Sequence, residues 1–353
     1  MPVLKGRHLK PKLRRSRRGL LASGASLLVL LVFVFGGFGY FFSSAAQQRH
    51  DIVMPVPGLP DLAGDQAAAY GKFERDGALN AALVEPAFTQ VRSRLDGVRV
   101  VFVPSYLSDV ALPSVALGKS LGYMAGIYSW LGDAGIETEI ADIETEDSVV
   151  ANAARLQAIM ARDSMPVCFV THSKGGLDVL EYLRTASRDE RARVRCWVAM
   201  QAPFLGSPVA DLATDVAGLP EIASVLLEAL GGQGESLSDL TTRERLNYMA
   251  EHRGEITKVL DQVSPLCLAT YVPDPGAFEK PTSWSYPALV WMHDSGVAND
   301  GLVAVRSALE ICPRSLMLTG LDHTGIVAPG LVAPIDQEAL MKALLVLALD
   351  TPQ

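Results

Sequence analysis

Ser173 lies where residue types and spacing favour nucleophilic chemistry. Residues 167–170 form a short apolar run that predicts a buried strand, and residues 177–183 repeat leucine at helical spacing. A strand, a sharp turn that carries a serine and a helix are the setting of a nucleophile elbow. The turn would lift the Ser173 hydroxyl above the edge of a sheet, and the first N–H groups of the helix would face an oxyanion formed there.

The positions around the serine bear on this interpretation. The turn is crowded, so it needs small residues two positions before and two positions after the nucleophile. Gly175 satisfies the second requirement, whereas Thr171 departs from the usual Gly-x-Ser-x-Gly pattern, which leaves an ordinary strand-to-helix turn as the alternative. We expect the oxyanion hole to combine the backbone N–H of Lys174 with that of Tyr106, or else of Ser105, in the loop after the first strand.

A serine hydroxyl needs a base, and in this type of site the order along the chain is serine, acid, histidine. Of the six histidines only His323 comes late enough, in a loop directly after an apolar run. Asp300, in an Asn-Asp-Gly turn, lies one predicted element earlier and would fix the imidazole tautomer. Asp294 is the alternative acid, and Asp322 is too close to the histidine to orient it from behind. The sequence therefore predicts a triad of Ser173, Asp300 and His323.

Charge is divided unevenly along the chain of 353 residues. Eight of the 31 Lys and Arg residues lie within positions 1–18, which contain no acid, whereas the whole chain has 39 Asp and Glu residues and a net charge of −8. The remainder of the chain is therefore strongly acidic. Nucleic acid is not an expected partner, because phosphate contacts need a basic surface.

The segment after the basic tail predicts a membrane anchor. Residues 19–48 contain no charged side chain, and residues 20–42 are an apolar stretch long enough to cross a bilayer as a helix. A basic flank before an apolar span favours a cytoplasmic amino terminus. We therefore expect a single-pass protein of the inner membrane with its catalytic domain on the periplasmic or extracellular side. Export followed by signal cleavage near Ala46 is the alternative.

The four cysteines bear on compartment and cofactors. Cys168 and Cys196 lie in apolar, strand-like runs and are interpreted as buried thiols. Cys267 and Cys312 could pair outside the cytoplasm, but the sequence leaves their pairing open. No cysteine has the spacing of zinc ligands, so we expect no metal and no cofactor.

Strands and helices alternate through most of the chain. Apolar runs predict strands at 98–103, 136–140, 167–170, 194–200, 266–271, 288–292 and 316–319, and helical periodicity predicts helices at 121–134, 148–162 and 337–349 besides the helix after the serine. This alternation predicts an α/β fold with a mostly parallel sheet and helices on both faces.

The predicted elements also divide the chain. We expect a basic cytoplasmic tail at 1–18, a transmembrane signal-anchor at 19–42, a stalk or lead-in at 43–97 and a catalytic domain at 98–353. Residues 212–262 interrupt the alternation with helical sequence. We interpret this insertion as a lid over the site, with an extra pair of packing helices as the alternative.

Several motifs together resemble the bacterial triacylglycerol lipases of the α/β-hydrolase fold, over much of residues 98–327. Residues 172–176 (His-Ser-Lys-Gly-Gly) resemble the lipase box, and residues 201–211 resemble the Ala-Pro-His-x-Gly-Ser segment that leads into the lid of that family. Residues 299–303 resemble the segment that carries its acid. The resemblance implies an α/β-hydrolase fold and the same three residues, Ser173, Asp300 and His323.

Three positions depart from the pattern of that family. Its oxyanion loop usually contains His-Gly, where this chain has Pro104 and Ser105. Phe204 replaces the histidine of the Gly-Ser segment. Gly325 stands where the family has a calcium-binding aspartate, two residues after the catalytic histidine, so we expect no calcium at that position.

These observations predict a membrane-anchored serine carboxylic-ester hydrolase of the lipase or esterase type, which acts on a lipid or another ester through an acyl-enzyme. An acyltransferase that uses the same triad is one alternative. A non-catalytic, membrane-tethered binding or folding module is the other, and the order of the three triad residues argues against it.

Overall fold

The structure is a computed structural model that describes residues 65–105, 124–144, 146–215, 235–277, 285–327 and 335–350. The chain divides into two compact units, Met1–Gln48 and Arg49–Gln353, and every described residue belongs to the second. The predicted tail at 1–18 and anchor at 19–42 lie outside the described residues. Within the described ranges, no helix combines the length and the apolar character needed to span a membrane.

Six parallel strands form the central sheet, in the order β4-β3-β5-β6-β7-β8. They are β3 (Arg99–Val103), β4 (Thr138–Ile140), β5 (Val167–His172), β6 (Val194–Met200), β7 (Leu266–Tyr271) and β8 (Arg314–Thr319). Every residue of β3 and β5 is buried. Strands covered on both faces need continuous apolar runs, which is the pattern that these segments have in the sequence.

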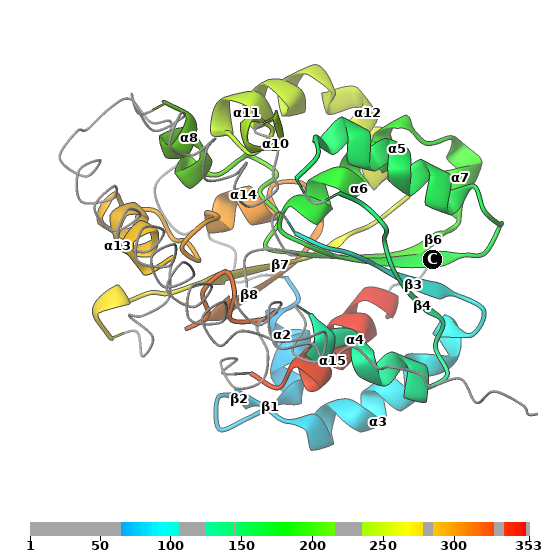
Figure 1. Cartoon of the computed structure of the whole chain (residues 1–353). Helices are drawn as coiled ribbons and strands as arrows, with labels where there is room; N and C mark the ends of the chain where they lie inside the picture. Colours follow the sequence, from blue (N-terminus) through cyan, green and yellow to red (C-terminus); the bar gives the residue numbers. More distant parts are fainter. Residues whose placement is uncertain are drawn as a thin grey trace, which may run out of the picture. The chain divides into compact units, whose positions relative to one another are not determined.

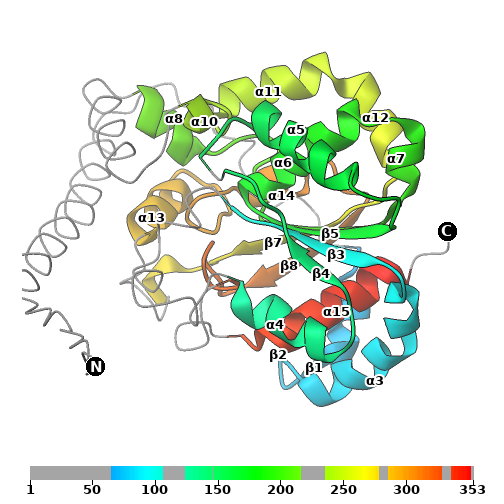
Figure 2. The same ribbon diagram turned by 45° about the vertical axis from the view of Figure 1, so that its right-hand side comes forward.

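Helices cover both faces of the sheet (Figures 1 and 2). They are α2 (Ala67–Tyr70), α3 (Ala81–Val91), α4 (Ala125–Asp133), α5 (Val149–Met160), α6 (Lys174–Thr185), α7 (Arg188–Ala192), α8 (Pro208–Asp215), α10 (Glu235–Ser238), α11 (Thr242–Glu251), α12 (Arg253–Leu260), α13 (Tyr286–Asp294), α14 (Val305–Leu309) and α15 (Gln337–Leu349). Helices α3, α4 and α15 pack in the core on one face, and α5, α6, α12 and α14 pack on the other. The predicted parallel sheet with helices on both faces is confirmed.

Helix α15 shows how sequence and burial agree in this fold. The Asp336 side chain caps its amino end by accepting a hydrogen bond from the backbone N–H of Ala339 at 3.0 Å. All of its side chains except Glu338 and Lys342 are buried, so its apolar surface is much wider than the single stripe of a surface helix. It contacts α3, α4 and the sheet, and it thereby closes one face of the core.

Residues 65–97 correct the predicted stalk. They form α2, α3, a short hairpin of β1 (Glu74–Arg75) and β2 (Ala78–Leu79), and the 3-10 turns η1 (Gly71–Phe73) and η2 (Arg92–Leu95). Tyr70, Phe88 and Leu95 are buried in the same core cluster as α15. The described part of the segment 43–97 therefore packs in the same core as the sheet and α15, so it does not form a separate stalk.

A second correction concerns residues 288–292. The structure has helix α13 there, where the apolar run predicts a strand. Pro287 lies at the beginning of this helix, a position where its fixed φ angle favours helix formation. A short apolar run fits a strand and a buried helical segment equally well, so periodicity alone does not separate the two.

The insertion at 212–262 is helical in its described part. The end of α8 and the helices α10, α11 and α12 occupy it, and α12 packs against α6 through Ile256 and Val259. Residues 216–234 lie outside the described residues. The role of this insertion as a lid stays a prediction.

Both pairs of cysteines form disulfides. Cys168 of β5 and Cys196 of β6 face each other across neighbouring strands, with their Cα atoms 4.6 Å apart, so their interpretation as buried thiols is wrong. Cys267 of β7 is bonded to Cys312, with a Cα separation of 5.8 Å. The sequence left the pairing of these two residues open, and in the structure they are bonded to each other.

Candidate active site

Ser173 occupies the turn between β5 and α6, as the sequence predicts. Its backbone has φ +52° and ψ −127°, a conformation that costs free energy for any residue other than glycine. The Ser173 N–H donates to the carbonyl of Met200 at 2.9 Å, and the Ser173 carbonyl accepts from the N–H of Gly176 at 2.9 Å. The strained turn is thus anchored to the next strand and to its own helix.

The turn needs a residue without a side chain at position 175, where the chain has glycine. A Cβ atom there would lie 2.5 Å from the carbonyl oxygen of Val103 and 2.7 Å from that of Pro104. These are backbone atoms, which do not move aside cheaply. The helix after Ser173 therefore lies directly against the loop that follows β3, which is the loop predicted to complete the oxyanion hole.

Asp300 and His323 are joined by a hydrogen bond. Asp300 Oδ2 lies 2.8 Å from His323 Nδ1, and the two residues are 1% and 3% exposed. The other carboxylate oxygen of Asp300 accepts from the backbone N–H groups of Leu302 at 3.0 Å and Val303 at 2.7 Å. The His323 N–H also donates to the Asp300 carbonyl at 2.7 Å. The imidazole is thereby fixed through both its ring and its backbone.

The second ring nitrogen of His323 is set apart from these contacts. Nε2 is buried and has no hydrogen-bond partner within the described part of the chain. Because Nδ1 donates to Asp300, Nε2 carries the lone pair that takes a proton.

Asp300 reaches this position by a different route from the predicted one. It does not follow a strand but lies in a loop between α13 and α14, beside the end of β7, where the Val272 N–H donates to the Asn299 carbonyl at 3.2 Å. The Asn299 side chain accepts from the N–H of Gly301 at 2.8 Å, which closes the predicted Asn-Asp-Gly turn. The alternative acid, Asp294, is at the exposed end of α13 and lies beside His293.

His172, directly before the serine, lies against the histidine loop. The rings of His172 and His323 have centroids 4.8 Å apart, and His172 Nε2 is 3.2 Å from the His323 carbonyl oxygen. Burial, and in smaller part the positive charge that His323 can carry, lowers the pKa of His172 to about 3. His172 is therefore neutral near pH 7 in the folded protein.

Lys174, directly after the serine, is buried in an ion pair on α6. Its Nζ lies 3.1 Å from Asp178 Oδ1, and Asp178 Oδ2 accepts from the Asn152 side chain at 3.2 Å. Burial raises the pKa of Asp178 to about 6, opposed by the attraction of Lys174. The side chain of Lys174 thus points into the core beside α5, and only its backbone N–H is a candidate for the oxyanion hole.

The oxyanion loop is only partly described. Tyr106, the predicted second donor, lies outside the described residues, whereas Ser105, two residues after the end of β3, is 7% exposed. In the parallel register, Val103 of β3 pairs with Thr171 of β5, so the loop after β3 begins beside the turn that carries Ser173. The first N–H groups of α6 have no acceptor within the helix, as in every helix, and face the same edge of the sheet.

Metal ligands are not gathered at this site. The described residues contain no group of three His, Cys, Asp or Glu side chains arranged to hold a metal ion. Asp322, the acid next to His323, uses Oδ1 to accept hydrogen bonds from the backbone N–H of Thr324 at 3.1 Å and from its hydroxyl at 3.0 Å. The expectation of no calcium at Gly325 stays a prediction.

Gln201 is a site residue that sequence analysis missed. It follows β6, is fully buried, and has φ +52°. Its side chain contacts His172 and the loop that carries His323. A polar residue at the carboxyl end of an apolar strand is the signal that the sequence holds, since ligands and catalytic groups gather at that edge in open parallel sheets.

Comparisons with known proteins place the fold. The chain matches no protein-family model, and no curated protein gives a significant sequence match. Its structure is similar to that of a metagenomic carboxyl esterase, MGS0156, at 23% identity and a TM-score of 0.57, over 88% of this chain and 90% of the esterase. The chain therefore has the α/β-hydrolase fold found in bacterial lipases and esterases.

Two further likenesses were found among solved structures. The mature lipase BlEst2 from Bacillus licheniformis is 20% identical, with a TM-score of 0.47, over 65% of this chain and 85% of the lipase. The lipase of Staphylococcus hyicus is 15% identical, with a TM-score of 0.45, over 70% of this chain and 92% of the lipase.

Proposed function

We propose that the protein is a serine carboxylic-ester hydrolase of the lipase or esterase type, with Ser173 as nucleophile, His323 as general base and Asp300 as the acid. The observation that carries this proposal is the buried 2.8 Å hydrogen bond between Asp300 and His323, next to a strained turn that presents a serine. The order of the three residues along the chain and the α/β-hydrolase fold support the same assignment.

The reaction follows from the proton positions. His323 Nε2 takes the proton of the Ser173 hydroxyl while the Ser173 oxygen attacks the acyl carbonyl. Asp300 stabilises the resulting imidazolium by accepting a hydrogen bond from its Nδ1–H. The N–H of Lys174, with that of Tyr106, holds the oxyanion. His323 then protonates the alcohol as it leaves, and a water molecule, activated by the same base, releases the acid from the acyl-enzyme.

We also propose that the enzyme is anchored in the inner membrane through residues 19–42 and faces away from the cytoplasm. The uncharged, apolar segment behind a basic tail supports this orientation. The two disulfides support it independently, because disulfides persist in oxidising compartments and are rare in the cytosol. Export with cleavage near Ala46 would place the same domain on the same side without the tether.

The proposal is tested by expressing the full chain beside its Ser173→Ala variant and assaying separated membrane and soluble fractions. p-Nitrophenyl esters from acetate to palmitate report hydrolysis, and a fluorophosphonate probe labels only an activated serine. We expect hydrolysis and labelling in the membrane fraction for the wild type and neither for Ser173→Ala. The exposed Ser164→Ala variant, which keeps the site intact, is the matched control.

The outcomes separate the alternatives. Activity that survives in Ser173→Ala contradicts the nucleophile, and the absence of both hydrolysis and labelling in the wild type favours a non-catalytic module. Activity found only in the soluble fraction favours cleavage near Ala46. The ester with the highest kcat/KM distinguishes an esterase, which prefers short acyl chains, from a lipase.

A further inference from the structure

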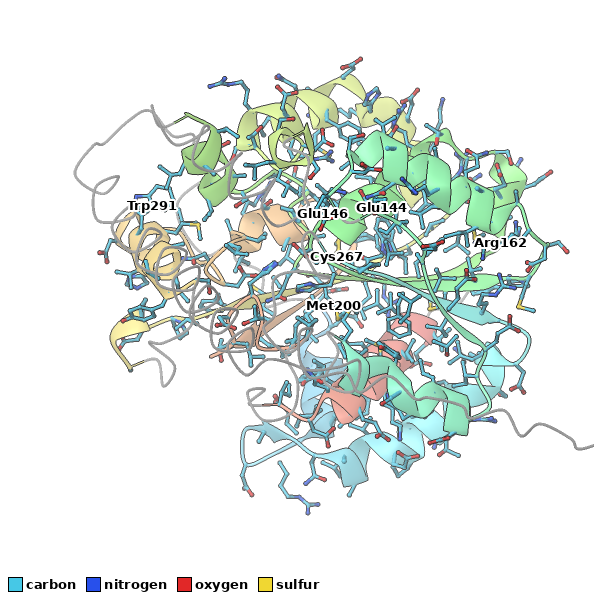
Figure 3. All side chains as sticks on the ribbon, in the orientation of Figure 1. Glu144, Glu146, Arg162, Met200, Cys267 and Trp291 are labelled. Atoms are coloured by element: carbon cyan, nitrogen blue, oxygen red, sulfur yellow. A yellow bond between two sulfur atoms is a disulfide. The ribbon has the colours of Figure 1, made fainter. Side chains whose placement is uncertain are left out.

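Gln201 is held in an unfavourable conformation directly after β6. Met200, the last residue of β6, and Cys267 in the neighbouring β7 are labelled in Figure 3, and Gln201 follows Met200 directly. Its side chain is fully buried, and its backbone φ of +52° is rare for a residue with a side chain. Its N–H donates to the Leu268 carbonyl at 2.7 Å. Such a strained conformation persists only where several surrounding contacts hold it, and strained residues cluster at functional sites.

The amide of Gln201 faces two segments at once. Its Nε2 donates to the Asp322 carbonyl at 3.2 Å and to the Thr270 hydroxyl. Because a carbonyl only accepts, the amide nitrogen must face Asp322, and Oε1 is then directed at His172. The distance from Oε1 to His172 Nε2 is 2.8 Å. The orientation of the amide is thus determined by its partners.

His172 continues the connection to the catalytic loop. Its Nε2 faces two acceptors, the Gln201 Oε1 at 2.8 Å and the His323 carbonyl at 3.2 Å, so this nitrogen carries the hydrogen and shares it. Gln201 and His172 therefore bind the carbonyls of two consecutive residues, Asp322 and His323. His172 is also covalently joined to Ser173, so one hydrogen-bonded pair links the nucleophile to the base.

We propose that Gln201, acting through His172, is a positioning residue that holds the His323 loop in register with Ser173. This inference rests on the proposed triad and adds to it a contact from outside the three residues. Asp300 sets the direction of the imidazole ring, whereas Gln201 and His172 set the place of the backbone that carries it. A displacement of about 1 Å between reacting groups costs about 100-fold in rate, so a tie of this kind controls kcat.

The test replaces Gln201 by an apolar side chain of similar length. In Gln201→Met the Asp322 carbonyl loses the contact with the Gln201 amide and the His172 N–H loses the shorter of its two acceptor contacts, so the loop is held by fewer contacts to β6. We expect kcat to fall about 30- to 100-fold with KM within about twofold, and the rate of fluorophosphonate labelling to fall with kcat. Thermal unfolding measured beside the assays shows that the variant is folded.

Ser307→Ala is the matched control, because it also removes a buried polar bridge. The Ser307 hydroxyl donates to the Gly206 carbonyl at 2.8 Å and accepts from the Leu205 N–H at 3.0 Å, and it contacts neither His172 nor the His323 loop. We expect this variant to lose stability while kcat stays within about twofold of the wild type, since its hydrogen bonds hold other segments. A fall in kcat common to both variants would reduce Gln201 to a structural role and overturn the proposal.

A second variant keeps the test open if Gln201→Met does not fold. His172→Phe fills the same space and removes the link to the His323 carbonyl while it leaves Gln201 in place. We expect a similar loss of kcat, and a double variant no slower than the slower single one, because residues that act as one unit are not additive. Folded variants with unchanged kcat, or losses that multiply, would contradict the inference.

A wild-type chain without hydrolysis or labelling would overturn the proposed function and this inference together, whereas wild-type activity that is lost in Ser173→Ala leaves only the role of Gln201 to be decided.

Discussion

The turn that carries Ser173 and the loop that carries His323 meet at one edge of the sheet but are held by different means. The turn is held by backbone contacts, from Ser173 to Met200 and Gly176, and by the close approach of Gly175 to the loop after β3. The histidine loop is held largely by side chains, in addition to the backbone hydrogen bond from the His323 N–H to the Asp300 carbonyl. Asp300 contacts His323 from 23 residues away along the chain. Gln201 contacts Asp322 from 121 residues away.

This difference predicts how each region fails. A backbone turn packed against backbone is sensitive to added atoms, because neither partner is able to move aside. A loop held by side-chain hydrogen bonds is sensitive to lost donors and acceptors, because each loss leaves a buried polar group without a partner. In the histidine loop, a substitution that keeps the shape of a side chain but removes a donor or acceptor should therefore impair catalysis. In the turn, a substitution that leaves polarity unchanged but adds atoms should have this effect.

The largest expected effect comes from Asp300→Asn, which preserves shape. The Asn oxygen would face the N–H groups of Leu302 and Val303, and its NH₂ would face His323 Nδ1, so the ring would take the wrong tautomer, with its proton on Nε2. We expect kcat/KM to fall about 10³- to 10⁴-fold with little change in thermal stability. Steady-state hydrolysis of the best ester measures this loss.

Asp294→Asn is the control for that prediction. Asp294 is the alternative acid from the sequence, and its side chain is 73% exposed at the end of α13. Its replacement should leave kcat/KM within about twofold of the wild type, as surface substitutions usually do. If Asp294→Asn proved the more damaging variant, the acid of the triad would have to be reassigned.

Gly175→Ala tests the turn by adding one methyl group. The new Cβ would lie 2.5 Å from the Val103 carbonyl oxygen, so α6 and the loop after β3 would have to separate. We expect kcat to fall about 100-fold, because this separation displaces the N–H of Lys174 from an oxyanion. Kinetics on the same ester, with the urea midpoint measured beside it, separate this effect from unfolding.

Gly132→Ala is the matched change for Gly175→Ala. Gly132 is also helical, in α4, and a Cβ there would meet nothing within 4 Å. Alanine should therefore stabilise the protein, by up to about 1 kcal/mol, and leave the kinetics unchanged. Equal kcat values in the two variants would show that the turn tolerates added volume, contrary to the comparison drawn above.

The length of chain over which a pattern extends explains what the sequence predicts. The boundaries of β6, β7 and α15 agree with prediction, because buried strands and helices leave apolar runs of matching length and period. The turn at Ser173 is predictable because its sequence signature, an apolar strand, a serine followed by Gly175 and a helical repeat, lies within residues 167–183. The Asp300–His323 pair is predictable only through the known order of such triads, and the hydrogen bond supports it.

Contacts between distant segments account for what prediction missed. Cys168 and Cys196 form a disulfide because β5 and β6 are neighbours in a parallel register that pairs these two residues, and no local pattern shows this neighbourhood. The partners of the Gln201 side chain lie 29 to 121 residues away along the chain. The run at 288–292 became a helix where a strand was expected, because five apolar residues satisfy both periods.

The smallest expected effect is on the pH dependence of the free energy of unfolding. It arises from His172, which contacts the histidine loop as a neutral ring. Its pKa is about 3 in the folded protein because the ring is buried, whereas an unfolded histidine has a pKa of about 6.5. Between these values the unfolded chain binds a proton that the folded chain excludes. The contribution of His172 to stability is therefore fully present above pH 6.5 and is lost as the pH falls, by up to about 1.4 kcal/mol per pH unit.

Urea unfolding of the wild type and of His172→Phe at pH 7.5, 6.5 and 5.5 measures this contribution. The variant has no group to titrate at this position, so its stability should fall less steeply with acid than that of the wild type. His293→Asn, which removes a half-exposed histidine on α13, should keep the wild-type dependence. Parallel curves for the wild type and His172→Phe would mean that His172 accepts a proton in the folded protein. The histidine loop would then be held by a charged pair of rings, and its sensitivity to lost hydrogen bonds would have a different origin from the one argued for Gln201.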